Sequence, residues 1–304
     1  MKLRNLLMVV LGLAGSYSMV AQSNLLNAKT PDEIGKKTEA QMESDNDKPL
    51  AYGYVHDRDV LMGKTIWEQI DLDERINFPL YFPIDTANIG RDRRSLFSVL
   101  LNGIKSGRIT EVYADDYFNT KKTLKDMETS FTYVDTVQSG IDEINNYYDD
   151  YRSGRKVLDE QYINRLELTA QDIFAYRIKG FWYFDKRQGE MKYRLLAICP
   201  VAPEAREIGK ENADPIELFW VYFPAIRDVL HEAKAFNDKN SAQPITFDHL
   251  LNSRRFNAVI YKEENVYGDR QIADYMKDNA QMQLLESERV KEKIRNFEQD
   301  MWNY

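Results

Sequence analysis

Alternation of apolar and polar residues along the chain predicts one clear β-hairpin. Residues 173–184 (IFAYRIKGFWYF) and 191–201 (MKYRLLAICPV) are rich in aromatic and β-branched side chains, and a glycine lies in the turn between them. This combination is typical of two antiparallel strands joined by a short turn. Shorter runs that we also interpret as strands lie at 109–113, 131–137, 218–223 and 258–261.

Between these predicted strands, apolar residues recur at the spacing of helices. Ser95 and Thr246 each precede apolar residues at helical spacing, so each is a candidate N-cap. Pro224 suits the first turn of a helix over 225–236. Residues 64–72 (KTIWEQIDL) predict a short helix or turn with an apolar inner side. Short helices mixed with aromatic-rich β-hairpins indicate an α+β fold.

The last segment, from residue 271 to residue 302, predicts one long charged helix. Its apolar residues recur at intervals of 4, 3 and 4, which gives a narrow seam. Such a seam either docks on its own domain or pairs with another subunit. The candidate interface comprises this seam and two aromatic residues beyond it: Val290, Ile294, Phe297, Met301, Trp302 and Tyr304.

Shifts in composition divide the chain into successive parts. They are a signal peptide (1–21), a flexible polar leader (22–55), a first α+β half (56–137), a flexible polar insertion or linker (138–160), a second α+β half with the hairpin (161–270) and a long C-terminal helix (271–304).

The two halves share short motifs. Tyr81-Phe82-Pro83 recurs as Tyr222-Phe223-Pro224, and Phe97-x-x-Leu100-Leu101-Asn102 recurs as Phe247-x-x-Leu250-Leu251-Asn252. An ancient duplication would explain both recurrences. The gaps between the motifs differ in length, so chance similarity is the alternative.

The first residues have the three parts of an export signal. Lys2 and Arg4 precede an apolar stretch at 6–15, and small residues follow it up to Ala21, after which we place the cleavage. The apolar stretch is about half the length of a membrane-spanning helix, which disfavours the alternative of an uncleaved anchor. No cysteine follows it closely, so we expect no lipid anchor here and a membrane tether only through a partner.

Composition narrows the class of protein. The net charge of −8 argues against nucleic acid as a partner. An exported chain with one cysteine, Cys199, has no internal disulfide, and its apolar neighbours predict that this thiol is buried. Aromatic residues make up 12% of the chain, which suits broad packed surfaces such as subunit interfaces.

Candidate chemistry is sparse. His56, His231 and His249 lie far apart, and the segment starting at His231 lacks the second histidine of a zinc-protease helix. The acid pairs Asp115-Asp116 and Asp149-Asp150 lack the alternating ligands of a calcium loop. Nucleophile-elbow and phosphate-loop motifs are missing. We therefore predict no catalytic, cofactor-binding or metal-binding residues and favour an assembly protein. The alternative is an exported protein that binds or hydrolyses an envelope polymer.

Several segments together carry a family resemblance. They are IWEQIDLDERINFPLYFP (66–83), LFSVLLNGIKSGRIT (96–110), FWYFDKRQGEMKYRLLAICP (181–200), ELFWVYFPAIRDVL (217–230), FNDKNSAQPITFDHLLNSRRF (236–256) and AVIYKEENVYGDRQI (258–272). In order and density they resemble the gliding-motility protein GldN family, called PorN in non-gliding relatives, of the type IX secretion system in Bacteroidetes-type bacteria.

This resemblance implies a periplasmic, non-enzymatic protein without a cofactor. It implies assembly with an outer-membrane lipoprotein of the GldK/PorK type into a large ring, and contact with inner-membrane motor proteins of the GldL/GldM type. The ring would support protein export and gliding. The family offers no catalytic motif to carry over to this sequence.

Overall fold

The computed structural model describes residue 30 and residues 48–85, 93–208, 210, 213–236, 245–277 and 279–302. The chain forms two compact units, and almost all described residues belong to the one that comprises Leu50–Phe236 and Ile245–Tyr304. The predicted signal peptide and most of the predicted leader lie outside the described residues.

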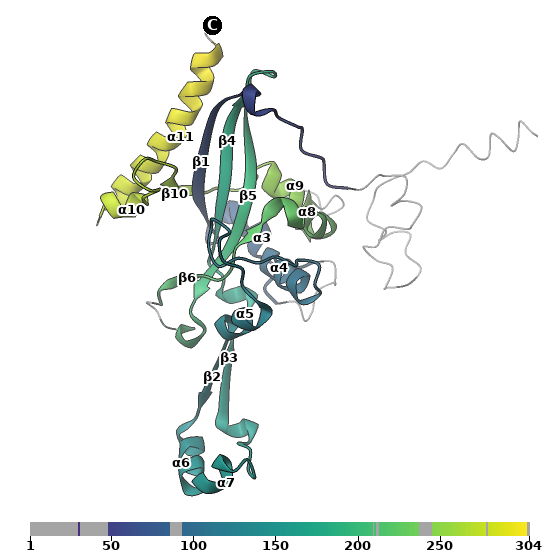
Figure 1. Cartoon of the computed structure of the whole chain (residues 1–304), viewed down its shortest axis with the longest axis vertical. Helices are drawn as coiled ribbons and strands as arrows, with labels where there is room; N and C mark the ends of the chain where they lie inside the picture. The colour runs from purple at the N-terminus through teal and green to yellow at the C-terminus, as the bar shows by residue number, and fades with distance from the viewer. Residues whose placement is uncertain are drawn as a thin grey trace, which may run out of the picture. The chain divides into compact units, whose positions relative to one another are not determined.

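One antiparallel sheet organises the unit (Figure 1). Its strand order is β10-β1-β4-β5-β6, and β7 also pairs with β5. The strands are β1 (Val60–Asp71), β4 (Ala175–Asp185), β5 (Glu190–Pro203), β6 (Pro215–Glu217), β7 (Val221–Tyr222) and β10 (Val259–Glu263). Because β1 comes from the predicted first half and its neighbours β4 and β10 from the second, both halves contribute to a single sheet. The division into halves itself stays a prediction.

The predicted hairpin is confirmed, whereas the predicted helix at 64–72 is wrong. β4 and β5 pair from Ala175↔Val201 to Asp185↔Glu190. Residues 60–71 form the central strand β1, which is buried on both faces around Ile66, Trp67 and Glu68. A strand that is buried on both sides does not alternate apolar with polar residues, so its spacing imitates a helix.

Helices cover one face of the sheet and enclose the main core. They are α3 (Phe78–Tyr81), α4 (Leu96–Lys105), α5 (Leu124–Phe131), α8 (Phe223–Glu232) and α9 (Phe247–Asn252). Both predicted caps are confirmed: the Ser95 hydroxyl accepts from the Ser98 amide, and the Thr246 hydroxyl accepts from the His249 amide. α8 starts at Phe223 with Pro224 in its first turn and ends at Glu232, and β8 (Lys234–Ala235) then pairs with β9 (Ile245–Thr246).

One predicted strand does not form, and another is shorter than expected. Residues 109–113 form no strand, and only Tyr113 makes isolated bridges, to Lys121 and Trp220. Of the predicted strand at 218–223, only Val221 and Tyr222 belong to a strand. In both places the apolar residues are buried in hydrophobic cores without regular strand pairing, and a pattern of side chains does not distinguish burial from pairing.

The predicted strand at 131–137 is confirmed as β2 (Thr132–Thr136), which pairs with β3 (Ile163–Glu167). The residues between these strands, which the sequence suggested were loop-like, form α6 (Gln138–Asn146) and α7 (Tyr148–Arg152). We call residues 132–167 the arm. In Figure 1 the β2–β3 ribbon runs away from the main sheet of the unit, with α6 and α7 at its far end.

The C-terminal segment is not one continuous helix. α10 (Ile272–Tyr275) ends at Tyr275, where Met276 leaves helical geometry, and α11 (Ala280–Trp302) follows. Val290 and Ile294 of the seam pack with Ile66 and Ile260 in a second small core. α11 therefore docks on the sheet of its own unit.

The repeated motifs lie in partly different structures. Tyr81-Phe82-Pro83 ends α3, with a cis bond before Pro83, whereas Tyr222-Phe223-Pro224 begins α8. The repeats that start at Phe97 and Phe247 both lie in helices, α4 and α9, which pack into the same core.

Candidate interaction site

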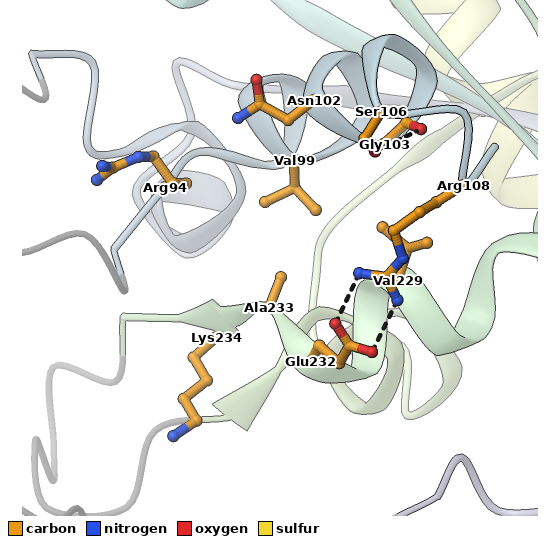
Figure 2. A pocket seen from close by; sticks show the side chains of 10 residues that line it. All are labelled: Arg94, Val99, Asn102, Gly103, Ser106, Arg108, Val229, Glu232, Ala233 and Lys234. Carbon is orange, nitrogen blue, oxygen red and sulfur yellow. Dashed lines mark hydrogen bonds and ion pairs between the residues drawn. The ribbon is translucent and has the colours of Figure 1, made fainter. Parts of the chain in front are cut away.

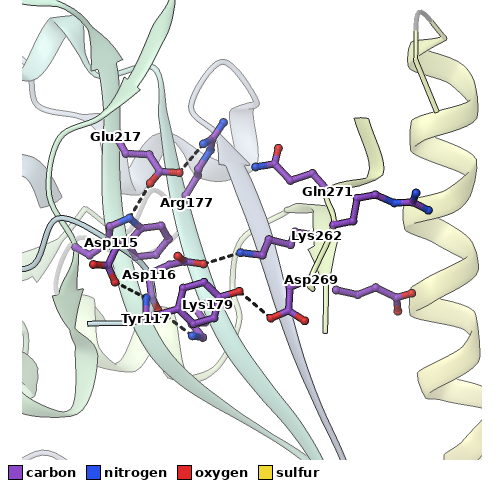
Figure 3. A network of polar contacts seen from close by, with 12 residues as sticks. Asp115, Asp116, Tyr117, Arg177, Lys179, Glu217, Lys262, Asp269 and Gln271 are labelled. Carbon is purple, nitrogen blue, oxygen red and sulfur yellow. Dashed lines mark hydrogen bonds and ion pairs between the residues drawn. The ribbon is translucent and has the colours of Figure 1, made fainter. Parts of the chain in front are cut away.

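Loop 113–122 covers the sheet face opposite the main core and joins it through two lysines. Lys262 on β10 donates to Asp116 at 2.9 Å, and its ammonium lies 4.2 Å from the centre of the Trp67 ring (Figure 3). Lys179 on β4 donates to the Asp116 carbonyl at 2.8 Å and lies 4.5 Å from the centre of the Tyr117 ring. Both cations are thus held between aromatic rings and a single acidic loop.

The pKa values of these two lysines shift in opposite directions. Burial lowers the pKa of Lys179, and the charge of Asp116 only partly offsets that effect. Burial also lowers the pKa of Lys262, but its hydrogen bonds with Asp116 and Tyr117 outweigh burial, so the net shift is upward. Both shifts follow from fixing the loop to the sheet.

In each of the two acid pairs noted in the sequence, one carboxylate has a hydrogen-bond or ion-pair partner within the chain. The Asp115 carboxylate accepts from the backbone amides of Tyr117, Asn119 and Thr120, and the hydrogen bond from Asn119 contributes most to its lowered pKa. In the arm, Asp150 lies 3.7 Å from Arg155. Among the described residues, no group of three or more His, Cys, Asp and Glu side chains could hold a metal ion.

Two buried ion pairs fix elements of the unit: one joins the loop after α9 to the sheet, and the other joins α8 to α9. Arg254 donates twice to Glu68 on β1, at 2.8 Å each, and Glu68 is 1% exposed. Arg227 on α8 donates to Asp248 on α9, at 2.7 and 3.0 Å. Bidentate pairs of this kind fix register and orientation. We therefore assign both pairs a structural role.

The remaining candidates for chemistry are dispersed. His56 and His249 are exposed on different elements, and His231 is half-buried in α8. Cys199 is buried in β5 as predicted, and burial raises the pKa of its thiol. A buried neutral thiol is a poor nucleophile.

A surface cleft of about 470 Å³ opens between α4 and α8 (Figure 2). Val99, Val229 and Ala233 give it an apolar floor. Its rim carries Arg94, Lys234 and Arg108, and Arg108 donates to Glu232 through two hydrogen bonds of 2.7 Å. The cleft thus combines an apolar floor with a mainly basic rim.

Among the described residues, exposed large apolar side chains gather in several places, three of which are relevant to assembly. The start of α11 exposes Met282, Leu284 and Leu285, and the α3 region exposes Ile76, Phe78 and Phe82. The largest set belongs to the arm: Tyr133, Val134, Val137, Ile141, Tyr147, Tyr148 and Val157. Exposed apolar groups gathered on one element mark interaction surfaces more often than single ones do.

The structure places the candidate interface residues partly inside the unit. Val290 and Ile294 are buried, Phe297 packs edge-on against Phe184 of β4, and Met301 is half-buried. Trp302 ends α11, and Tyr304 lies outside the described residues. The sequence suggested that the polar insertion 138–160 stays flexible until it is bound, and the adjacent tyrosines 147 and 148 of this segment are exposed at the end of the arm.

Within the described part of the chain, no helix combines the length and apolarity needed to cross a membrane. Comparison with curated proteins gave no match. The family described as "Gliding motility associated protein GldN" matches residues 55–303, which covers the sheet, the arm, the cleft and α11. This match agrees with the resemblance seen in the sequence. The chain is therefore a member of the GldN family, a structural component of the gliding motility and type IX secretion machinery.

Proposed function

We propose that this protein is a non-enzymatic structural component that works in the periplasm, after cleavage of its signal peptide near Ala21. It assembles with an outer-membrane lipoprotein of the GldK/PorK type into a ring that also contacts inner-membrane motor proteins of the GldL/GldM type. Family membership supports the assignment to the gliding motility and type IX secretion machinery. The periplasmic location, the ring and its named partners are what this proposal adds.

The observation that carries the proposal is the composition of the arm. Between Thr132 and Glu167 only Gly140 is buried, while several large apolar side chains from Tyr133 to Val157 are exposed. A two-stranded ribbon is marginally stable by itself in water. An arm of this kind gains its stability by docking on another molecule, which is the behaviour of an assembly subunit.

The alternative, an enzyme or binding protein for an envelope polymer, has less support. Glycoside hydrolysis needs two carboxyl groups facing each other across the bond to be cut. The cleft between α4 and α8 is lined by a single acid, Glu232, which is already paired with Arg108. The described cleft therefore lacks the pair of acids that this chemistry requires.

Size-exclusion chromatography with light scattering tests the proposal. The mature chain is run alone and after mixing with its lipoprotein partner, and an unrelated outer-membrane lipoprotein serves as the control. We expect a complex of many subunits only with the cognate lipoprotein. Monomers in every run would contradict the proposal.

Phe297 and Met301 remain candidate interface residues. They lie at the end of the seam where side chains are only half-buried. Changing both to Ser should leave the fold intact and weaken assembly in the same chromatographic assay. Unchanged assembly would remove this surface from the proposal.

A further inference from the structure

The arm needs a partner surface that its own unit does not supply. No member of the hydrophobic clusters of the unit lies between residues 132 and 167. The contacts of the ribbon with the body of the unit lie at its base, against α5 and the short turn Ala205–Glu207. The helical tip therefore presents Tyr147, Tyr148 and Val157 to solvent.

The arm is also acidic. It contains eight acidic and four basic residues. Two of the basic residues lie close to acids of the arm itself: Lys156 donates to Glu143 at 2.6 Å, and Arg155 lies near Asp150. Exposed acids remain, among them Asp142 and Glu160. The partner of the arm should therefore present an apolar surface with a basic border.

The cleft between α4 and α8 has this chemistry. Its floor is apolar, and Arg94 and Lys234 stand at one end of it while Arg108 stands at the other (Figure 2). Next to this rim the guanidinium of Arg93 stacks on the half-exposed ring of Phe236. A cleft of about 470 Å³ is within the size range of sites that enclose small organic groups, so it can receive one or two aromatic side chains.

The arm of the same copy does not fill this cleft. Figure 1 shows α6 and α7 at the end of the β2–β3 ribbon that is remote from α4 and α8. The two surfaces are different patches of one chain. A contact between them in two copies is heterologous, so the pair keeps one free arm and one free cleft, and the contact propagates into a ring or a filament.

We propose that the tip of the arm of one copy docks in the α4–α8 cleft of a second copy, with acids of the arm facing the basic rim. The proposal rests on the proposed function in one respect, namely that the protein works as a multi-subunit assembly. It adds which two surfaces of this chain meet there.

A charge-swap experiment tests the contact. The arm variant carries Asp142→Lys and Glu160→Lys, the cleft variant carries Arg94→Glu and Lys234→Glu, and a third protein carries all four changes. A matched control carries Asp57→Lys and Glu190→Lys, at exposed positions outside the arm, the cleft and α11, with the same change of net charge as the arm variant. Sedimentation measures self-association of the full mature chain bound to its lipoprotein partner, and thermal melting checks that each variant is folded.

We expect the arm and cleft variants each to weaken self-association by roughly tenfold or more, while the four-fold variant recovers most of the loss, because reversed ion pairs form again. The control should associate like the unaltered chain. Self-association of both single-surface variants at the unaltered level, or a four-fold variant weaker than either parent, would overturn the contact.

A pull-down of the lipoprotein partner separates this proposal from the proposed function. Variants that lose self-association but retain the lipoprotein support the arm–cleft contact. An arm variant that loses the lipoprotein, without rescue by the cleft changes, would mean that the arm binds the lipoprotein instead. If the unaltered chain neither self-associates nor retains the lipoprotein, the proposed function fails, whatever the variants do.

Discussion

At the scale of single residues, buried charged side chains hold elements of the fold in position. Glu68 lies on the central strand β1, is nearly inaccessible and is held by two hydrogen bonds from Arg254. The guanidinium also lies 4.2 Å from the centre of the Tyr193 ring. Glu68, Tyr193 and Arg254 thus join β1, β5 and the loop after α9 at one point, so loss of one of them should destabilise the sheet.

Changing Arg254 to Met should destabilise the fold strongly, because it leaves the Glu68 carboxylate buried without its partner. Breaking a buried pair from one side costs about 3–5 kcal/mol. The double variant with Glu68→Leu should recover a large part of this loss. Urea unfolding of the three proteins measures both effects, and equal stability of the two variants would contradict the interpretation.

Asp185, at the turn of the hairpin, should make the fold sensitive to acid. The hydrogen bond from Lys192 is the main cause that lowers its pKa below the ordinary value of 3.8. A carboxyl group with a lowered pKa in the folded state contributes stability above its unfolded pKa and loses it as the pH falls through the folded pKa. Asp185→Asn should therefore flatten the decline in stability below about pH 4, as measured by thermal melting across pH, whereas Asp135→Asn on the exposed arm should not.

At the scale of elements, the hairpin and both helix caps could be predicted because their signals are local. Paired strands next to a turn, and a hydroxyl before a helix, need no knowledge of the rest of the chain. β1 could not be predicted, because burial of its two faces depends on distant segments: loop 113–122 packs on Trp67, and α11 packs on Ile66. The candidate site shows the same limit: the seam was visible in the sequence, but its docking on the sheet depends on distant strands.

Gly180 in β4 should be essential for the hairpin. A Cβ atom at this position would lie 2.2–2.4 Å from atoms of the Tyr193 side chain, and this ring is held by its packing against Arg254. Gly180→Ala should therefore destabilise the fold by about 1–3 kcal/mol through overpacking. Gly53→Ala is the matched control, because a Cβ there meets no atom within 4 Å. Equal urea midpoints for the two variants would show that Tyr193 can move aside.

The two sides of α11 should respond differently to truncation. Ile294 is 6% exposed and packs on the sheet, so Ile294→Ala should cost about 2–4 kcal/mol. Leu285 is 63% exposed, so Leu285→Ala should change the free energy of unfolding by less than about 0.5 kcal/mol. Urea unfolding distinguishes the two, and a large loss from Leu285→Ala would mean that this residue is covered in the folded chain.

At the scale of the whole molecule, the described unit combines a well-packed sheet with an arm that has almost no interior. The sequence indicated the α+β class and family membership, both of which are confirmed. The sequence did not distinguish a polar linker from an arm that keeps large apolar side chains at its surface. That distinction depends on which apolar residues stay uncovered after folding, and only the three-dimensional structure shows this.

The position of β10 beside β1 also determines when the sheet can be completed. β1 begins at Val60, yet its partner on that side begins only at Val259. A chain that leaves a translocation channel N-terminus first therefore keeps an open strand edge until nearly all of it has emerged, and open edges invite pairing with other chains. A protein that ends at residue 258 should accordingly aggregate or be degraded in cells, whereas one that ends at residue 302 should persist.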